Sequence, residues 1–231
     1  MSTSKVLLVL GAGGNVGASV ASSFAKNGYK VAIAARRLSD AVDDDGNLQI
    51  QADLSKPETV KSSFDKVTAK FGPPSVVVYN AASAQPVPAE SPLDLPLEAF
   101  NRDIAVNTAS VLVAAQNAVE GFKKLPKGTA GTFIFTGNFL NVKTMPFLVS
   151  GGIGKAATAH LLQVASQAYA PQGFRFYFAD ERKADGSAAF RDISGPNHAE
   201  HYLSLAKSTE NQPWWQTFVG GQGYKHFPEK L

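Results

Sequence analysis

Four glycines follow directly on the first apolar run of the chain, Val6 to Leu10. They are Gly11, Gly13, Gly14 and Gly17, and together with Asn15 and Val16 they make up one turn. Glycines behind a buried strand let the backbone turn sharply and approach a phosphate, and the N-terminus of a following helix attracts its charge. The strict Gly-x-Gly-x-x-Gly fingerprint fails, because Val16 stands where its third glycine belongs. The wider spacing Gly-x-x-Gly-x-x-Gly fits, and we predict that the turn binds the phosphates of a dinucleotide.

Two arginines, Arg36 and Arg37, stand about twenty residues beyond this turn. A chain that selects NAD carries Asp or Glu there, to hold the ribose hydroxyls. A carboxylate would repel a 2′-phosphate, whereas a guanidinium group can pair with it in forked geometry. The arginines therefore favour NADP(H) as the cofactor.

Composition excludes several other chemistries. The 231 residues include no cysteine, so a disulfide, a thiol nucleophile and a thiolate metal site are impossible, and no His, Asp or Glu spacing indicates a metal. The net charge is only +3, and the basic residues cluster only at Lys123, Lys124 and Lys127, which argues against nucleic acid as a partner. The first apolar run is too short for a signal peptide or a membrane span, so we expect a soluble, cytoplasmic protein with a small-molecule substrate.

Alternating strands and helices must position these residues. Seven apolar runs predict strands, at Val6–Leu10, Lys30–Ala35, Leu48–Ala52, Ser75–Tyr79, Thr132–Thr136, Phe174–Ala179 and Trp215–Val219. Between them, helical spacing predicts helices from about Gly14, over 56–70, over Leu97–Lys123, over Ile153–Tyr169 and over His198–Ala206. This order predicts an α/β fold, a Rossmann-like doubly wound parallel sheet of about seven strands with helices on both faces.

We expect residues 1–231 to form a single NADP-binding domain, because the sequence shows no linker, repeat or low-complexity segment. The polar segment 180–197 is the expected variable, substrate-facing part. The two long helices are apolar on more than one face, which predicts a homodimer or homotetramer formed through them.

The chain resembles the short-chain dehydrogenase/reductase family over nearly its whole length. Four motifs carry the resemblance in order: Asp53 with Leu54, then Asn80-Ala81-Ala82, then Asn107 within Ile104–Thr108, then Lys155 followed by Ala156 and Ala157. In that family the aspartate contacts the adenine, and the Asn-Ala segment ends the fourth strand. The helical asparagine helps to hold a water and the catalytic lysine, and the lysine binds the nicotinamide ribose. The resemblance implies these roles for Asp53, Asn107 and Lys155.

Two catalytic positions depart from the family pattern. The family tyrosine, which protonates the substrate, lies four residues before the lysine, and Gly151 stands there. No tyrosine of this chain has a lysine four residues later. The family serine, which hydrogen-bonds the substrate carbonyl, corresponds to Asn138, whose amide can still donate a hydrogen bond. The expected catalytic set is therefore Asn107, Asn138 and Lys155.

Three interpretations follow from the missing tyrosine. In the first, the protein is a divergent NADPH-dependent oxidoreductase that delivers hydride to a carbonyl, enone or imine and takes any proton from Lys155, water or another group. In the second, it is a catalytically silent NADP-binding protein, a sensor or partner subunit. In the third, the cofactor pocket supports non-redox chemistry such as a cyclisation or isomerisation. The first is preferred, although loss of a general acid costs about 10² to 10⁴ in rate.

Other groups in the sequence could replace the missing acid. Gly151 leaves the space of a phenol ring for a bulkier substrate or for an acid from elsewhere. The candidate acids are Ser150, Asp180, Glu181 and Arg182, each of which is also an ordinary polar residue of a loop. His160 lies five residues after Lys155 and is interpreted as a packing or interface residue. Trp214 and Trp215 are interpreted as aromatic core or dimer contacts.

Overall fold

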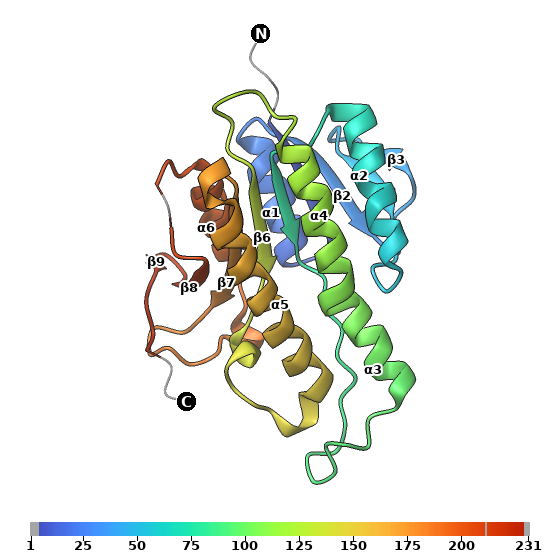
Figure 1. The fold of residues 1–231 in the computed structure, drawn as a ribbon, viewed down its shortest axis with the longest axis vertical. Helices are drawn as coiled ribbons and strands as arrows, with labels where there is room; N and C mark the ends of the chain where they lie inside the picture. The colour runs from blue at the N-terminus through green and yellow to red at the C-terminus, as the bar shows by residue number, and fades with distance from the viewer. Residues whose placement is uncertain (1–4, 211, 229–231) are drawn as a thin grey trace.

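One continuous sheet runs through the molecule in the computed structural model, which describes residues 5–210 and 212–228. The strand order is β3-β4-β2-β1-β5-β6-β7-β8-β9 (Figure 1). The strands are β1 (Val6–Leu10), β2 (Lys30–Ala35), β3 (Ala41–Val42), β4 (Leu48–Gln51), β5 (Val76–Tyr79), β6 (Thr132–Thr136), β7 (Arg175–Glu181), β8 (Trp215–Val219) and β9 (Gly223–Tyr224). Those from β4 to β8 in this order are parallel to one another. The predicted Rossmann-like α/β fold is confirmed.

The sheet has nine strands in the described residues rather than about seven, because two short antiparallel strands were not foreseen. β3 lies in the polar segment that the sequence leaves as a loop. The aspartate run beside it forms the turn back to β4, where Asp43 Oδ1 accepts the N–H groups of Asp45 and Asn47 at 3.1 and 2.8 Å. Strands of two residues have no hydrophobic alternation to reveal them.

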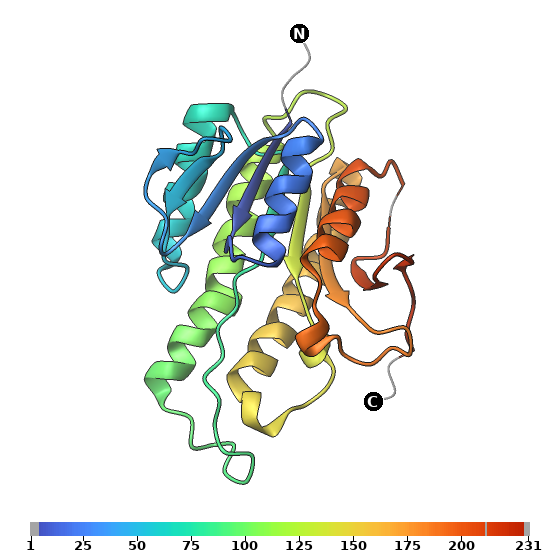
Figure 2. The same cartoon turned by 180° about the vertical axis from the view of Figure 1, so that it is seen from behind.

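Helices cover both faces of the sheet. They are α1 (Val16–Lys26), α2 (Pro57–Phe71), α3 (Leu97–Ile104), α4 (Ser110–Phe122), α5 (Val149–Tyr169) and α6 (Gly195–Lys207). Figure 1 shows α2, α4 and α5 in front of the sheet, and Figure 2 shows α1 in blue and α6 in orange-red across the other face. Two separate clusters of buried apolar side chains result, one on each face. Both faces of the parallel strands are buried, which explains their uninterrupted apolar sequences.

The helix expected over Leu97–Lys123 is interrupted. A wide π-helical turn, η1 (Ala105–Ala109), separates α3 from α4, and Asn107 lies at its centre. The hydroxyl of Thr158 in α5 donates to the Asn107 carbonyl oxygen at 2.5 Å. The hydrogen bond thus ties the wide turn to α5, and single π turns of this kind often occur at functional sites.

The segment after the sixth predicted strand is also corrected. β7 runs on through Asp180 and Glu181, which pair with Thr217 and Phe218 of β8, so these acidic residues do not belong to a variable loop. Both are buried, although charged side chains are usually exposed, because each carboxylate has polar partners. Asp180 pairs with Arg182, and Glu181 accepts hydrogen bonds from Ser194 and Asn197. Similarly, α6 begins at Gly195, which leaves 182–194 as the connecting segment and adds the turn η5 (Phe190–Asp192).

Three further short 3-10 turns complete the chain. They are η2 (Phe139–Asn141), η3 (Pro146–Leu148) and η4 (Ala170–Gln172). α5 follows η3 directly and begins at Val149, one turn earlier than expected, so Gly151 lies in its first turn. Of the helices described, none has the length and apolar character needed to cross a membrane.

Candidate functional site

Two cavities open at the carboxyl ends of the parallel strands. The first, of about 570 Å³, lies beyond β1, β2, β4 and β5, and the second, of about 280 Å³, lies beyond β6 and β7. Ten residues of the expected cofactor site line the first cavity: Gly11, Gly13, Gly14, Arg36, Arg37, Asp53, Leu54, Asn80, Ala81 and Ala82. In open α/β sheets, ligands bind at this edge. The parallel topology thus collects residues from four separate strand ends.

The glycine turn owes its shape to two close approaches. Gly11 has φ +94°, and a Cβ there would lie 2.4 Å from the backbone nitrogen of Ala81. A Cβ on Gly17 would lie 2.7 Å from Ala12 Cα, so this glycine lets the turn pack on its own helix. Asn80 Nδ2 donates to the Gly11 carbonyl at 2.9 Å and fixes the turn from β5. Larger residues at either glycine would move the backbone.

Gly13 and Gly14, unlike Gly11 and Gly17, have no close neighbours. A Cβ at either position would find no atom within 4 Å, so both face open space. The next residues start α1, whose first N–H groups have no partner within the helix. A bare backbone before a helix N-terminus suits a phosphate group.

Arginine side chains supply positive charge around the first cavity. Arg36 and Arg37 follow the end of β2 and are exposed. Arg102 of α3 lines the same cavity and was not singled out from the sequence, where it looks like an ordinary helix cation. These guanidinium groups fit the anionic groups of a nucleotide.

Asp53 lies beyond β4, where it caps the following turn. Its Oδ1 accepts the backbone N–H of Ser55 at 3.1 Å and the Ser55 hydroxyl at 2.8 Å. Burial works to raise the pKa of Asp53, but the hydrogen bonds from Ser55 and the nearby charges of Lys56 and Arg36 outweigh it, so the pKa lies below its ordinary value. The group is an ionised acceptor at neutral pH.

The remaining turn residues lie outside the described lining of the first cavity. Val16 is buried in the core cluster under α1. The Asn15 side chain bridges away from the turn, donating to the Ile193 carbonyl at 2.9 Å and accepting the Gly195 N–H at 2.8 Å. Asn15 therefore ties the glycine turn to the segment that closes the second cavity.

Lys155 projects from α5 onto the end of β6. Its Nζ donates to the Thr136 carbonyl at 2.7 Å and lies 4.3 Å from the centre of the Phe135 ring. Burial lowers the pKa of Lys155 to about 7, although the charge of Asp180 acts in the opposite direction. Burial disfavours the charged ammonium, so this amine can gain or lose a proton near neutral pH.

Asn107 takes part in a polar network that also reaches Gly151. Its side chain exchanges two hydrogen bonds with the Ser83 backbone, at 2.5 and 3.0 Å. The Ser83 hydroxyl donates to Asp103 at 2.5 Å, and Ser150, directly before Gly151, donates to the same carboxylate at 2.7 Å. Asp103 was missed from the sequence, although it lies one helical turn before Asn107 on the same face.

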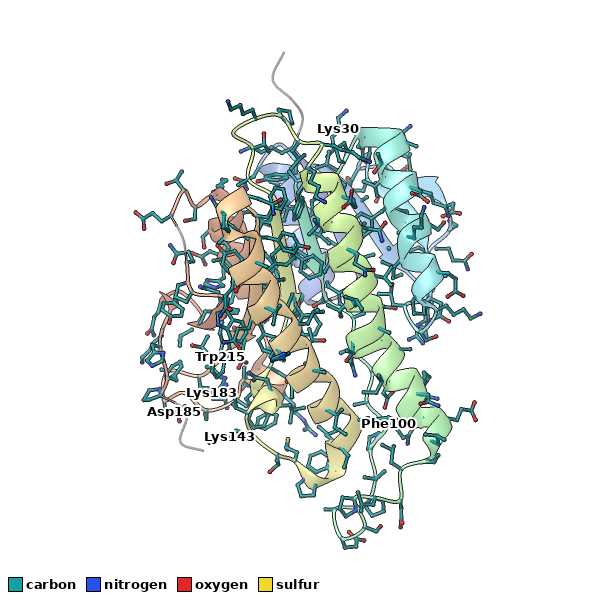
Figure 3. All side chains as sticks on the ribbon, viewed as in Figure 1. Lys30, Phe100, Lys143, Lys183, Asp185 and Trp215 are labelled. Atoms are coloured by element: carbon teal, nitrogen blue, oxygen red, sulfur yellow. The ribbon has the colours of Figure 1, made fainter. Side chains whose placement is uncertain are left out.

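The second cavity holds the substrate side of the expected site. Gly137 and Asn138, which follow β6, line it together with Asp180 and Glu181 of β7. Asn138 Oδ1 accepts the Leu140 N–H at 3.1 Å, which leaves the amide nitrogen as the group that can donate to a ligand. Figure 3 labels Lys143 and Lys183 at this end of the sheet, opposite Lys30 at the amino end.

The residues around Gly151 leave less room than the space of a phenol ring that we predicted from the sequence. A Cβ added to Gly151 would meet the Ala84 Cβ at 3.2 Å and lie within 3.9 Å of Leu140 and Leu148. Leu140 and Leu148 also line the second cavity. Any side chain at 151 would therefore need Ala84 to move by a few tenths of an ångström to admit its Cβ.

Each acid candidate already has a partner. Ser150 is fully buried and donates to Asp103. Arg182 Nε and Asp180 Oδ2 form a buried ion pair at 2.5 Å. Glu181 accepts hydrogen bonds from the first turn of α6 and its cap. Of these four, Asp180 and Glu181 line the second cavity.

The other residues weighed from the sequence lie away from both cavities. His160 is exposed on α5. Trp214 and Trp215 are half-buried, stack at 6.2 Å between ring centres and pack against the core under α5, as their interpretation as core residues requires. Within residues 5–210 and 212–228, no group of three or more metal-binding side chains comes together.

Comparison with known proteins agrees with this geometry. A family model described as enoyl-(acyl carrier protein) reductase matches residues 11–179. The short chain dehydrogenase/reductase dmxR12 of Cryptosporiopsis sp. (strain 8999) is 39% identical over 98% of this chain and 96% of its own length.

Two solved structures show the same fold. A short-chain type dehydrogenase/reductase from Mycobacterium marinum has a TM-score of 0.79 and 26% identity, with 95% of each chain covered. The 3-ketoacyl-(acyl-carrier-protein) reductase of Brucella melitensis, complexed with NADH, has a TM-score of 0.79 and 23% identity over 94% of this chain and 97% of its own. The protein belongs to the short-chain dehydrogenase/reductase family of oxidoreductases, whose members bind nicotinamide cofactors.

Proposed function

We propose that the protein is a divergent NADPH-dependent oxidoreductase that delivers hydride to a small-molecule carbonyl, enone or imine. The observation that carries the proposal is the first cavity, where bare glycines and the exposed Arg36 and Arg37 face one space. The second cavity beside it offers an apolar wall and a few polar groups to a substrate.

The preference for NADPH rests on the end of β2. Arg36 and Arg37 stand there and line the first cavity, and the sequence has no carboxylate at that point that would repel a phosphate. Asp53, from the next strand, is the acceptor proposed for the adenine side. Arg102 adds a third cation to the lining of this cavity.

Three residues have proposed roles at the reacting end. NADPH, when bound, supplies a hydride. Lys155, fixed on the Thr136 carbonyl, holds the nicotinamide ribose, and the Asn107 network keeps α5 in place beside it. Asn138 donates its amide N–H to the substrate oxygen, where negative charge develops. The residue at the usual tyrosine position, Gly151, has no side chain to give a proton.

The proposal is tested by offering NADPH and a panel of activated ketones, enones and preformed iminium ions to the purified protein. We expect NADPH oxidation with at least one class, and deuterium in the isolated product when both hydrogens at C4 of NADPH are replaced by deuterium. Product formation without deuterium transfer would contradict hydride delivery.

The same panel separates the alternatives. Tight NADPH binding with no turnover of any compound would identify a silent NADP-binding protein instead. Asn138→Ser combined with Gly151→Tyr restores the two family positions, and gained ketone reduction would show that only the acid is missing. Gly151→Ala is the matched control, because it fills the space next to Ala84 without adding an acid.

A further inference from the structure

A carboxylate and an imidazole meet on the wall of the second cavity. Glu181, the last residue of β7, and His198, in the first turns of α6, both line it, and Glu181 Oε2 lies 3.3 Å from His198 Nδ1. Their side chains are 5% and 1% exposed. Asn138, the proposed donor to the substrate oxygen, lines the same cavity.

The carboxylate is held in place from the start of α6. Ser194 donates its backbone N–H to Glu181 Oε2 at 2.8 Å, and Asn197 Nδ2 donates to Oε1 at 2.7 Å. A carboxylate next to a helix N-terminus also gains from the helix dipole. Glu181 is therefore a fixed anion with little freedom to rotate.

The histidine ring is fixed, because one of its two nitrogens already makes a hydrogen bond within the protein. Nδ1 lies 2.8 Å from the Ser194 carbonyl oxygen, which can only accept, so Nδ1 carries the hydrogen. The ring edges meet Tyr202 and Phe218, with ring centres 5.5 and 5.0 Å away. Nε2 is then the ring nitrogen left to act on a ligand, and Glu181 stabilises the imidazolium that forms when Nε2 takes a proton.

We propose that His198, oriented and charge-stabilised by Glu181, is the proton donor and acceptor for the substrate in the second cavity, in place of the side chain that Gly151 lacks. This inference rests on the proposed oxidoreductase function. Glu181 is a positioning residue in it, and His198 is the catalytic acid and base.

The step balances as an ordinary reduction. Hydride leaves the reduced nicotinamide for the carbonyl carbon, and the electron pair of the C=O π bond moves to oxygen. Nε2–H of the imidazolium then protonates that oxygen, which leaves an alcohol, oxidised cofactor and a neutral imidazole that keeps its Nδ1–H. Solvent returns one proton to Nε2, so each turnover consumes one NADPH and one H⁺.

The charges around the ring set the pH dependence. Glu181 of β7 and His201 of α6 act on the ring through their charges, and the Tyr202 ring packs against it. Asp180 and Arg191 line the same cavity. Burial lowers the pKa of His198, the bond to Ser194 and the charge of Glu181 act against it, and the pKa remains below the ordinary value. Reduction should therefore accelerate as pH falls toward this pKa, and alcohol oxidation should accelerate above it.

The test compares two bicyclic acceptors of similar size. Reduction of 1-tetralone needs a proton, whereas reduction of the preformed 2-methyl-3,4-dihydroisoquinolinium ion needs only hydride. We expect His198→Gln to lower kcat for the ketone by about 10² or more and to leave iminium reduction within about threefold. The acid limb of the ketone pH profile should disappear. His160→Gln, on the exposed face of α5, is the matched control.

The same measurements distinguish failure of the oxidoreductase function from failure of His198 as its acid and base. No hydride transfer from the wild type to either compound contradicts the oxidoreductase. Equal losses with both acceptors would show that the substitution harms binding or hydride transfer rather than protonation. A ketone pH profile that survives in His198→Gln would assign the proton to Lys155 or solvent. Either result overturns the role of His198. Glu181→Gln keeps the imidazole but should shift the acid limb to lower pH, because the counter-charge is gone.

A second measurement does not depend on turnover. Imidazole ¹⁵N spectra of the NADP⁺ complex, with the four histidines assigned from single His→Gln variants, report the tautomer of His198. We expect a neutral Nδ1–H form at pH 7.5 and an Nε2 shift that changes when 1-tetralone is added. An Nε2–H tautomer would overturn the proposal, and so would an Nε2 chemical shift that stays the same when 1-tetralone is added. Both results can be obtained even if the protein catalyses no reaction.

Discussion

Lys155 places an amino group where a positive charge is poorly solvated. Burial lowers its pKa to about 7, from 10.5 for an exposed lysine, and its contacts are one carbonyl oxygen and an aromatic face. Between these two pH values the unfolded chain holds more protons than the folded one. Stability without cofactor therefore rises with pH through this window.

The free energy of unfolding in urea should increase by about 2 kcal/mol between pH 7 and pH 9, and Lys155→Met should be stable and nearly independent of pH there. Lys26→Met, at the exposed end of α1, is the control and should keep the wild-type slope. A wild-type curve that is flat from pH 7 to pH 9 would contradict the lowered pKa.

The arginines that follow β2 should determine the choice of cofactor. Arg36→Ala with Arg37→Ala should raise the Kd of NADPH by about 10- to 100-fold, because charge-assisted bonds to the phosphate are lost, and should change NADH binding little. Fluorescence titration with both cofactors measures this. Lys30→Ala, at the opposite end of the sheet in Figure 3, is the matched loss of charge. Equal affinities of the wild type for NADPH and NADH would count against the preference.

At the scale of elements, a buried carboxylate holds three segments together. Asp103 in α3 accepts the hydroxyls of Ser83 and Ser150 and the backbone N–H of Gln85 at 2.6 Å. Burial works to raise the pKa of Asp103, but these hydrogen bonds outweigh it and keep the pKa below its ordinary value. Its contribution to stability is therefore present at neutral pH and lost in acid, as pH falls through the folded-state pKa.

Asp103→Asn tests this contribution. The amide cannot accept all three donors, so we expect a loss of about 3 kcal/mol in the free energy of unfolding at pH 7. Urea denaturation measures it, with Asp94→Asn in the exposed loop as the control, which should stay within about 0.5 kcal/mol of wild type. Equal stability of both variants would show that Asp103 is structurally neutral.

Sequence periodicity located the apolar elements well. β1, β2, β6 and β8 have the predicted bounds, because each is a short apolar run followed by a polar or glycine residue. The π turn at Ala105–Ala109 was missed because a contact from Thr158, about fifty residues away, accompanies it. The end of β7 was missed because acidic residues normally end a strand, and the partners of Glu181 come from α6.

The candidate site divides in the same way. Gly11, Arg36 and Asp53 could be placed near one another, since strand ends in a parallel sheet share an edge. The pairing of Glu181 with His198 could not, because it depends on where α6 begins and on which side of the sheet it packs. Two residues that meet from different elements have no characteristic spacing in the sequence, so sequence analysis cannot detect the pair.

At the scale of the whole molecule, apolar side chains remain exposed on the two helices expected to form an interface. Ile153 and Val164 of α5 are 45% and 51% exposed, and eleven residues, close to three full turns, separate them, so they lie on one stripe. Leu112 of α4 is 43% exposed. An exposed apolar stripe of this kind suits an isologous contact between two copies.

Ile153→Glu with Val164→Glu should therefore convert a homodimer or homotetramer to smaller species. Light scattering after size exclusion measures the mass, and retained NADPH binding shows that the fold persists. Leu93→Glu, 86% exposed in the loop before α3, adds the same charge away from the stripe and should leave the mass unchanged. A wild type that is already monomeric would refute the interface.

The two edge strands of the sheet affect aggregation. Each described margin is a two-residue antiparallel strand, β3 or β9, rather than one of the longer parallel strands. Long exposed edges recruit strands from other chains and begin aggregation. Short antiparallel strands shield β4 and β8 from such recruitment, so partially unfolded molecules should aggregate only after β3 or β9 detaches, and the native protein is left to associate through its helices.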